Sequence, residues 1–231
     1  MTPQSHLSAA SVEWLAPQGT RVGVDRMLRI QGYTAMDKVR PMVRETAERN
    51  AVRAEALFEP SVCYRRIPVV NCNDGTLALA GGTSLHCGAF TRFLSCAREV
   101  AVFVTTAGAR IDDELARLHA EQELLDMLFL ESAAWLGIEE ITKAFVVHLR
   151  ARAAEDQLRL TRRMGPGYSY KTDDGNAEWP LEEQVALFSL FGDTTLPVHL
   201  LESCAMLPKM SRSGLIGLVP SVAHERADRP A

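Results

Sequence analysis

The segment RRMGPGYSY, residues 162–170, combines the side chains and the backbone freedom that a small-ligand site requires. Arg163 offers a planar fork of N–H donors that matches a carboxylate in bidentate geometry. Gly165 and Gly167 have no Cβ, so a ligand can approach the backbone closely at both positions. Tyr168 provides a flat ring with a hydroxyl at its tip. These residue types predict a site for a small zwitterionic or nucleoside-like ligand, with a structural turn flanked by solvent-facing arginines as the alternative.

Other chemical motifs are absent or weak in this sequence. It contains no GxSxG, P-loop, GxGxxG or HExxH pattern, and no catalytic residue is predicted. The spacings Cys63 to Cys72 and Cys87 to Cys96 invite a metal interpretation, but zinc ligands come in closer pairs, so reduced, partly buried thiols are favoured. The stretch 81–84, Gly-Gly-Thr-Ser, could cradle an anion at a helix start, although a turn followed by an N-cap is the preferred interpretation.

Composition limits the class of protein. The 231 residues are 47% hydrophobic and 23% charged, which is ordinary for a packed globular protein. The net charge of −4 argues against a nucleic-acid partner, whose phosphates require a basic surface. No apolar run approaches the roughly 18 residues that span a bilayer, and the first residues lack the pattern of a signal peptide. We therefore expect a cytoplasmic protein that binds neither nucleic acid nor membrane.

Helical and extended patterns follow one another without a regular βαβ rhythm, which predicts an α+β fold. We expect a mixed or antiparallel twisted sheet with flanking helices. The longest helix should span 121–155, where one face carries Leu124, Leu128, Trp135, Ile138, Thr142, Phe145 and Leu149. A break is expected near Gly137. Glu131 lies on the same face, and a carboxylate reaching solvent from the helix edge is favoured over a functional acid.

The remaining elements are expected around this helix. The run VAVFVT at 100–105 is typical of a strand buried on both faces. One domain is expected over residues 21–222, with a flexible arm at 1–20 and a flexible tail at 223–231. The other predicted elements are a helix at 37–57 capped by Asp37, strands at 62–70 and 76–80, a helix at 84–97, a polar loop at 171–179, a helix at 181–191 ended by Gly192, and strands at 197–201 and 214–219.

A second stretch, LLESCAMLPKMSRSG at 200–214, follows the first at a distinctive spacing. Together they read Arg-x-x-x-Gly-Tyr at 163–168, Glu-Ser-Cys-Ala-Met-Leu-Pro at 202–208 and Ser-Arg-Ser-Gly at 211–214. This order resembles the activation domain of cobalamin-dependent methionine synthase, which has Arg-x-x-x-Gly-Tyr, Thr-Glu-Ser-x-Ala-Met-x-Pro and Ser-x-Ser-Gly. The resemblance covers about residues 160–215, and the strand ending in VTTAG before the long helix is similar to the short, free-standing members of the family.

The resemblance implies that the protein binds S-adenosylmethionine, with Arg163 on the methionyl carboxylate. It implies a reactivation role, in which a flavodoxin-type donor and S-adenosylmethionine return the cob(II)alamin of a partner to its methylated form. Because the sequence has no room for homocysteine, folate and cobalamin modules, we expect an accessory subunit that acts in trans on a corrinoid-binding methyltransferase module. The ligand-binding residues implied in this way are Arg163, Gly165, Gly167, Tyr168, Glu202 and Ser203.

Departures from the family pattern leave an alternative open. Residues 169–174 replace the family's Pro-Ala-Cys segment, Leu201 replaces its Thr, and Ile216 stands where an aromatic residue contacts the ligand. These changes favour a non-catalytic interaction scaffold for a corrinoid protein that has lost ligand binding. An independent small-molecule methyltransferase is a third hypothesis, which no proton-accepting residue beside the loop supports.

Overall fold

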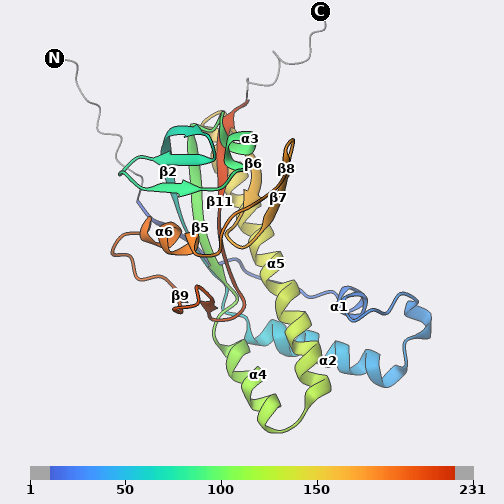
Figure 1. Ribbon diagram of the computed structural model, residues 1–231. Helices are drawn as coiled ribbons and strands as arrows, with labels where there is room; N and C mark the ends of the chain where they lie inside the picture. Colours follow the sequence, from blue (N-terminus) through green and yellow to red (C-terminus); the bar gives the residue numbers. More distant parts are fainter. Residues whose placement is uncertain (1–10, 222–231) are drawn as a thin grey trace, which may run out of the picture.

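The computed structural model of the chain describes residues 11–221, and its largest element is a seven-stranded antiparallel sheet (Figure 1). Its strands are β1 (Glu13–Leu15), β2 (Ser61–Asn73), β3 (Thr76–Leu79), β4 (Ser84–His86), β5 (Glu99–Thr106), β6 (Leu158–Met164) and β11 (Ser211–Pro220). They run in the spatial order β4-β3-β2-β5-β11-β6, while β1 and β3 pair with opposite ends of the long strand β2. The sheet confirms the predicted α+β class in its antiparallel form.

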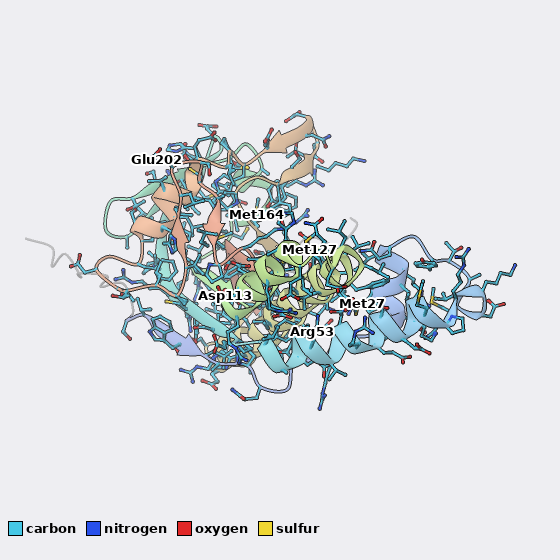
Figure 2. The ribbon with its side chains drawn as sticks, turned by 90° about the horizontal axis from the view of Figure 1, so that it is seen from below. Met27, Arg53, Asp113, Met127, Met164 and Glu202 are labelled. Atoms are coloured by element: carbon cyan, nitrogen blue, oxygen red, sulfur yellow. The ribbon has the colours of Figure 1, made fainter. Side chains whose placement is uncertain are left out.

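Helices cover both faces of this sheet. They are α1 (Val24–Ile30), the 3-10 helix η1 (Met36–Lys38), α2 (Pro41–Leu57), α3 (Phe90–Leu94), α4 (Arg110–Ala120), α5 (Leu124–Glu155) and α6 (Glu183–Ser189). Helices α1, α2, α4 and α5 share one hydrophobic core with one face of the sheet, and α3 and α6 share a second core with the other face. Figure 2, seen from below, shows α2 crossing α5 in the first of these layers. Two small hairpins, β7 (Ser169–Thr172) with β8 (Gly175–Glu178) and β9 (His199–Leu200) with β10 (Met206–Leu207), complete the chain.

Strand β5 is buried on both faces, as its β-branched and aromatic sequence predicts. Every residue from Val100 to Thr106 is buried. Phe103 points into the core beneath α5, and Val102 points into the core beneath α3 and α6. Because β5 lies between β2 and β11, its backbone is paired on both edges, and from Val100 to Thr106 its side chains are buried on both faces.

Helix α5 is continuous, so the break expected at Gly137 is wrong. A Cβ built at Gly137 would lie 2.1 Å from Cζ of Phe58, the residue that follows α2. The glycine therefore allows the Phe58 ring to pack directly on the helix backbone, and this contact explains a residue that otherwise weakens helices. Tertiary packing, which sequence periodicity does not report, decides the conformation here.

The predicted buried face of α5 is right in its second half and wrong in its first. Ile138, Thr142, Phe145 and Leu149 are buried against the sheet. Leu124, Leu128 and Trp135 are instead exposed, because the first half of α5 packs against α2 and α4 through a different face: Leu130, Ala133 and Ala134. Glu131 reaches Lys209 Nζ at 2.5 Å with 42% of its side chain exposed, in keeping with a carboxylate at the helix edge.

Several other predicted elements differ from the structure. Helix α2 starts at Pro41 with Arg40 at its N-cap, so Asp37 is not the cap and lies in η1. The stretch 84–97 forms strand β4 and the short helix α3, because Leu85 pairs with Leu77 and joins the core at the sheet edge. No helix therefore starts at Ser84, and Gly81 and Gly82 form a β3–β4 turn with positive φ angles of 96° and 92°.

The predicted N-terminal arm, polar loop and strand at 197–201 also differ from the structure. Glu13–Leu15, inside the expected arm, pair with β2, whereas residues 1–10 and 222–231 lie outside the described residues. The predicted polar loop at 171–179 is largely the β7–β8 hairpin, and the strand expected at 197–201 is reduced to His199–Leu200. Within residues 11–221, no helix has the length and apolar character needed to cross a membrane.

The thiols offer a direct test of the packing. Cys63 is buried in β2, and burial raises the pKa of its thiol to about 12. We expect Ellman's reagent at pH 8 to modify exposed Cys96 rapidly and Cys63 only after unfolding, because the thiolate is the nucleophile. Since the folded pKa of Cys63 is raised, its contribution to stability is complete below the unfolded pKa of about 8.5 and declines as pH rises toward 12. Rapid labelling of Cys63 in the folded protein, mapped by peptide mass spectrometry, would contradict this packing.

Candidate functional site

The loop that follows β6 is held in one conformation by the residues around it. Gly167 has a φ of +82°, which favours glycine, and its N–H donates to the Trp179 carbonyl at 2.7 Å. The Trp179 N–H donates in turn to the Tyr168 carbonyl at 3.0 Å. The buried Tyr170 hydroxyl accepts from the Gly165 N–H at 2.6 Å and donates to the Gly165 carbonyl at 3.0 Å. The loop is therefore preorganised, and the backbone polar groups of Gly165 are already paired.

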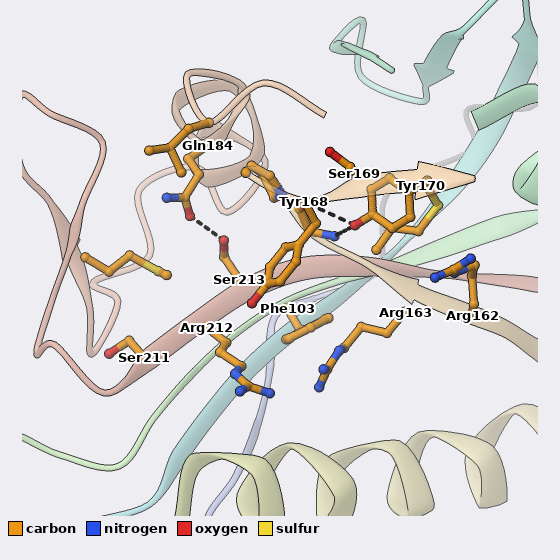
Figure 3. A pocket seen from close by; sticks show the side chains of 16 residues that line it. Phe103, Arg162, Arg163, Tyr168, Ser169, Tyr170, Gln184, Ser211, Arg212 and Ser213 are labelled. Atoms are coloured by element: carbon orange, nitrogen blue, oxygen red, sulfur yellow. Dashed lines mark hydrogen bonds between the residues drawn. The ribbon is translucent and has the colours of Figure 1, made fainter. Parts of the chain in front are cut away.

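A cavity of about 520 Å³ opens beside this loop (Figure 3), within the size range of small-molecule sites. The loop meets the end of β11 and the start of α6 here, so segments far apart in sequence form the walls. The lining residues are Phe103, residues 162–170, Leu181, Gln184, Met206 and residues 211–213. The charged side chains of this lining are arginines, and no carboxylate from the described part of the chain joins them. The cavity thus favours a ligand that carries an anionic group.

Arg163 provides the available positive charge. It pairs with Ile216 across β6 and β11, and its side chain is exposed and points toward α5 (Figure 3). Among residues 11–221 it has no hydrogen-bond or ion-pair partner. Arg212 also lines the cavity, but its Nη1 lies 2.7 Å from Glu139 Oε1 and its guanidinium lies over the Trp135 ring. Arg163 is therefore the guanidinium best placed to hold a ligand carboxylate.

The glycines of the site allow close approach of the two strands. A Cβ at Gly165 would lie 2.9 Å from the Ser213 carbonyl oxygen, and one at Gly214 would lie 2.2 Å from the Met164 carbonyl oxygen. The sequence predicts Gly165 as a position where a ligand approaches the backbone. The structure shows in addition that glycine is needed here because β6 approaches β11 closely. The missing Cβ atoms set the position of Arg163 relative to Ser213.

Tyr168 and Arg162 lie on either side of this loop with different environments. Tyr168 is 57% exposed and its ring extends over the cavity (Figure 3), where it is open to a planar ligand. The Arg162 guanidinium lies 4.8 Å from the Phe93 ring centroid and 5.1 Å from that of Tyr170. The Arg162 side chain is exposed and in addition stacks on these two aromatic rings, which helps to fix β7 against α3.

Glu202 and Ser203 do not line the cavity. They occupy the exposed turn between β9 and β10, where Ser203 Oγ accepts from the Ala205 N–H at 3.4 Å and Cys204 has a φ of 61°. Figure 2 shows Glu202 far from the helical layer around α5. From the 200–214 stretch, the cavity is reached by Met206 and by residues 211–213. Arg163, Gly165, Gly167 and Tyr168 are thus brought together, and Glu202 and Ser203 lie apart from them.

Gln184 is a member of the site for which the sequence offers no signal. It is buried on α6, where its Nε2 donates to the Cys204 carbonyl at 2.7 Å and its Oε1 accepts from the Ser213 hydroxyl. The side chain therefore ties the turn at 201–205 to β11, and Met206 follows directly. Only tertiary contacts give this glutamine a role, because a single polar residue in an amphipathic helix is ordinary.

Replacing Gln184 by alanine should lower the free energy of unfolding by about 1–3 kcal/mol, because the buried Cys204 carbonyl loses its donor. Urea unfolding followed by circular dichroism measures this effect. Ser189→Ala is the matched control on the same helix, since the Ser189 hydroxyl donates only to Ala186 one turn earlier and is exposed. Equal stability of the two variants would show that the bridge through Gln184 does not hold the turn.

Comparison of the sequence with protein families and with curated proteins finds no match. Among solved structures, the fold is similar to the crystal structure of the MetH reactivation domain bound to AdoHcy, with a TM-score of 0.60 and 13% sequence identity. The similarity covers 90% of this chain and 78% of that chain. At this identity it establishes the architecture alone: the chain shares the fold of a MetH reactivation domain.

Proposed function

We propose that this protein is an S-adenosylmethionine-binding reactivation subunit that acts in trans on a cobalamin-dependent methionine synthase or a related corrinoid methyltransferase. The observation that carries the proposal is the Arg163 guanidinium at a preorganised cavity: within residues 11–221 it has no partner, and no carboxylate lines the cavity. The similarity to a domain crystallised with AdoHcy supports the same ligand class. The motif order from Arg163 to Gly214 supports it independently, because the order and spacing of residues do not depend on the fold.

The residues of the cavity fit the chemical groups of this ligand. Arg163 would hold the α-carboxylate through paired N–H donors. Tyr168 would lie against the adenine or ribose, while Leu181 and Met206 offer apolar contact for the rest of the molecule. Among residues 11–221 no acid lines the cavity to pair with the ammonium group of the ligand, so backbone carbonyls or water would have to contact it.

The contribution of this chain to the reaction is positioning. S-adenosylmethionine supplies an electrophilic methyl group on a sulfonium, and the cobalamin of the partner supplies the reduced metal that accepts it. Arg163 and the loop at 165–168 would fix one end of the ligand, so that its methyl group is presented to the partner rather than tumbling freely. Methyl transfer of this kind requires no residue to take up a proton, and the described residues that line the cavity include no carboxylate or histidine. A flavodoxin-type donor remains the proposed source of the electron.

Isothermal titration of the purified chain with S-adenosylmethionine and with S-adenosylhomocysteine tests the proposal. Both should bind at one site, and methionine or adenosine alone should bind far more weakly, because each makes only part of the contacts. A well-folded protein that binds neither compound would overturn the proposal. A second assay adds S-adenosylmethionine, a reductant and an inactivated corrinoid methyltransferase that lacks its own reactivation domain, and it measures the recovery of activity.

A second candidate is an interaction scaffold that binds a corrinoid protein but no S-adenosylmethionine. Ile216 favours it, because this side chain is 1% exposed and belongs to the core beneath α5, so it contributes nothing to the cavity. The place of Glu202 and Ser203 outside the cavity favours it as well. Binding of a corrinoid module with an affinity that S-adenosylmethionine leaves unchanged would support the scaffold over the reactivation subunit.

A further inference from the structure

A second hollow of about 520 Å³ lies between α5 and the edge strand β6. It is lined by Lys143, Val146, Val147, Arg150, Arg162 and Arg163, and is called here the α5–β6 groove. Every charged residue of its lining is a cation, in a chain whose net charge is −4. The groove adjoins the ligand cavity, because Arg162 and Arg163 line both.

Three of these cations are available to an incoming anion. Arg150 is exposed and, like Arg163, has no ion-pair or hydrogen-bond partner among residues 11–221. Lys143 lies 2.7 Å from Glu140, but Arg26 neutralises the same carboxylate from 2.5 Å, so this trio remains positive. The guanidinium of Arg162 is occupied by its aromatic stack. Lys143 and Arg150 are two helical turns apart, roughly 10 Å along α5, and Arg163 faces them from β6.

The shape of the groove favours a protein surface over a small phosphate compound. Phosphate sites gather free backbone N–H groups at helix N-termini or in nests. The α5–β6 groove lies along the second half of the 32-residue helix α5, where the N–H groups are bonded within the helix. Between its cations lie Val146 and Val147, and Val147 is 62% exposed. An apolar centre inside a charged rim is the usual composition of a protein–protein interface.

We propose that the α5–β6 groove is the docking site for an acidic face of a protein partner. The groove and the ligand cavity share the arginines of β6, so a protein that covers the open side of the cavity also extends over the groove. Carboxylates on that protein would meet Lys143 and Arg150, while Arg163 holds the carboxylate of the ligand. This charge pairing speeds association and fixes the orientation of the partner. The identity of this partner as the methyl-accepting protein rests on the proposed function, but the acidity of its face rests on the groove alone.

Fluorescence anisotropy with a fluorescein-labelled octaglutamate peptide tests the docking site at about 50 mM salt. Wild type should bind it saturably and should bind an octalysine peptide at least tenfold more weakly. The double variant Lys143→Gln/Arg150→Gln should bind octaglutamate about tenfold more weakly, because it loses two ion pairs. The matched control is Lys38→Gln/Arg40→Gln, which removes the same charge from two exposed cations before α2 and should bind like wild type.

Three results would overturn the docking site. They are an absence of saturable octaglutamate binding, an equal loss in the control variant, and displacement of the peptide by pyrophosphate at lower concentration than by unlabelled octaglutamate. The last result would indicate a phosphate site instead.

Titration of the groove variant with S-adenosylmethionine separates the two proposals, because Lys143 and Arg150 do not line the ligand cavity. If the groove variant loses octaglutamate binding but still binds S-adenosylmethionine, the result supports the docking site. If the wild-type protein binds octaglutamate but not S-adenosylmethionine, the docking site is supported and the proposed function is overturned.

Discussion

Arg163→Ala is expected to weaken S-adenosylmethionine binding by roughly 10- to 100-fold. A charge-assisted hydrogen-bonded pair contributes about 1.5–3 kcal/mol. The other two arginines of the cavity lining are engaged, because Arg212 pairs with Glu139 and Arg162 stacks on aromatic rings. The free energy of unfolding should barely change, since Arg163 is exposed and its side chain has no partner among residues 11–221. Isothermal titration gives the affinity, and urea unfolding verifies that the fold is intact.

Two comparisons make this result specific. Arg163→Lys keeps the charge but loses the planar fork, so it should recover only part of the affinity. Arg98→Ala removes an exposed arginine outside the cavity and should bind like wild type. If Arg163→Ala binds S-adenosylmethionine as tightly as Arg98→Ala does, the carboxylate clamp is assigned to the wrong residue.

Gly214→Ala is expected to lower the free energy of unfolding by about 2–4 kcal/mol and to abolish ligand binding. The new Cβ would lie 2.2 Å from the Met164 carbonyl oxygen, a backbone atom in β6 that no rotamer change can move. Strands β6 and β11 must separate, and overpacking of this kind costs about 1–3 kcal/mol before lost strand pairing is counted. Because Arg163 lies near the end of β6, the separation would also displace the proposed clamp from Ser213. Chemical denaturation and ligand titration measure the two effects on the same protein sample.

Gly23→Ala is the matched control for this substitution. Its Cβ would meet nothing closer than 3.7 Å, the Cδ of Arg26, and its φ of −79° suits any residue. We expect a change below about 1 kcal/mol, because alanine is only a poorer N-cap than glycine at the start of α1. If the Gly214→Ala and Gly23→Ala proteins have the same free energy of unfolding, then β6 and β11 can separate without loss of stability, and the prediction is wrong.

Much of the fold could be predicted from local pattern. The continuous apolar run of β5 and the long periodic stretch of α5 identify these two elements correctly. Burial on both faces of a strand requires an unbroken apolar run, and an amphipathic helix requires apolar residues at steps of three and four, so both patterns are visible in the sequence. The errors fall where distant residues decide the outcome. Gly137 stays helical because Phe58 packs on it, and Leu128 is exposed because α2 and α4 cover the other side of α5.

The candidate site divides in the same way. The sequence predicts the residues of the Arg163–Tyr168 loop together, since a turn and its flanking side chains are contiguous in sequence and reach the same cavity. Gln184 and Arg212 enter the cavity only through folding, because α6 and β11 are brought to the loop by the sheet. Conversely, Glu202 and Ser203 belong to the same sequence motif as Met206 but do not reach the cavity. The chain turns between them at Cys204, which has a left-handed backbone conformation.

The sequence by itself determined the chemical character of this protein: a guanidinium, two glycines and a tyrosine on one turn, in an α+β chain with an acidic balance. These properties depend on residue identity and short-range spacing, which folding does not alter. Only the tertiary structure decided which charges remain free. The sequence does not distinguish three arginines of the cavity: Arg162, Arg163 and Arg212. In the structure Arg162 stacks on aromatic rings and Arg212 pairs with Glu139. Within residues 11–221, Arg163 is the one of these three whose guanidinium remains available to a ligand. The difference arises because a strand turns successive side chains to opposite faces, and each face meets a different layer of helices.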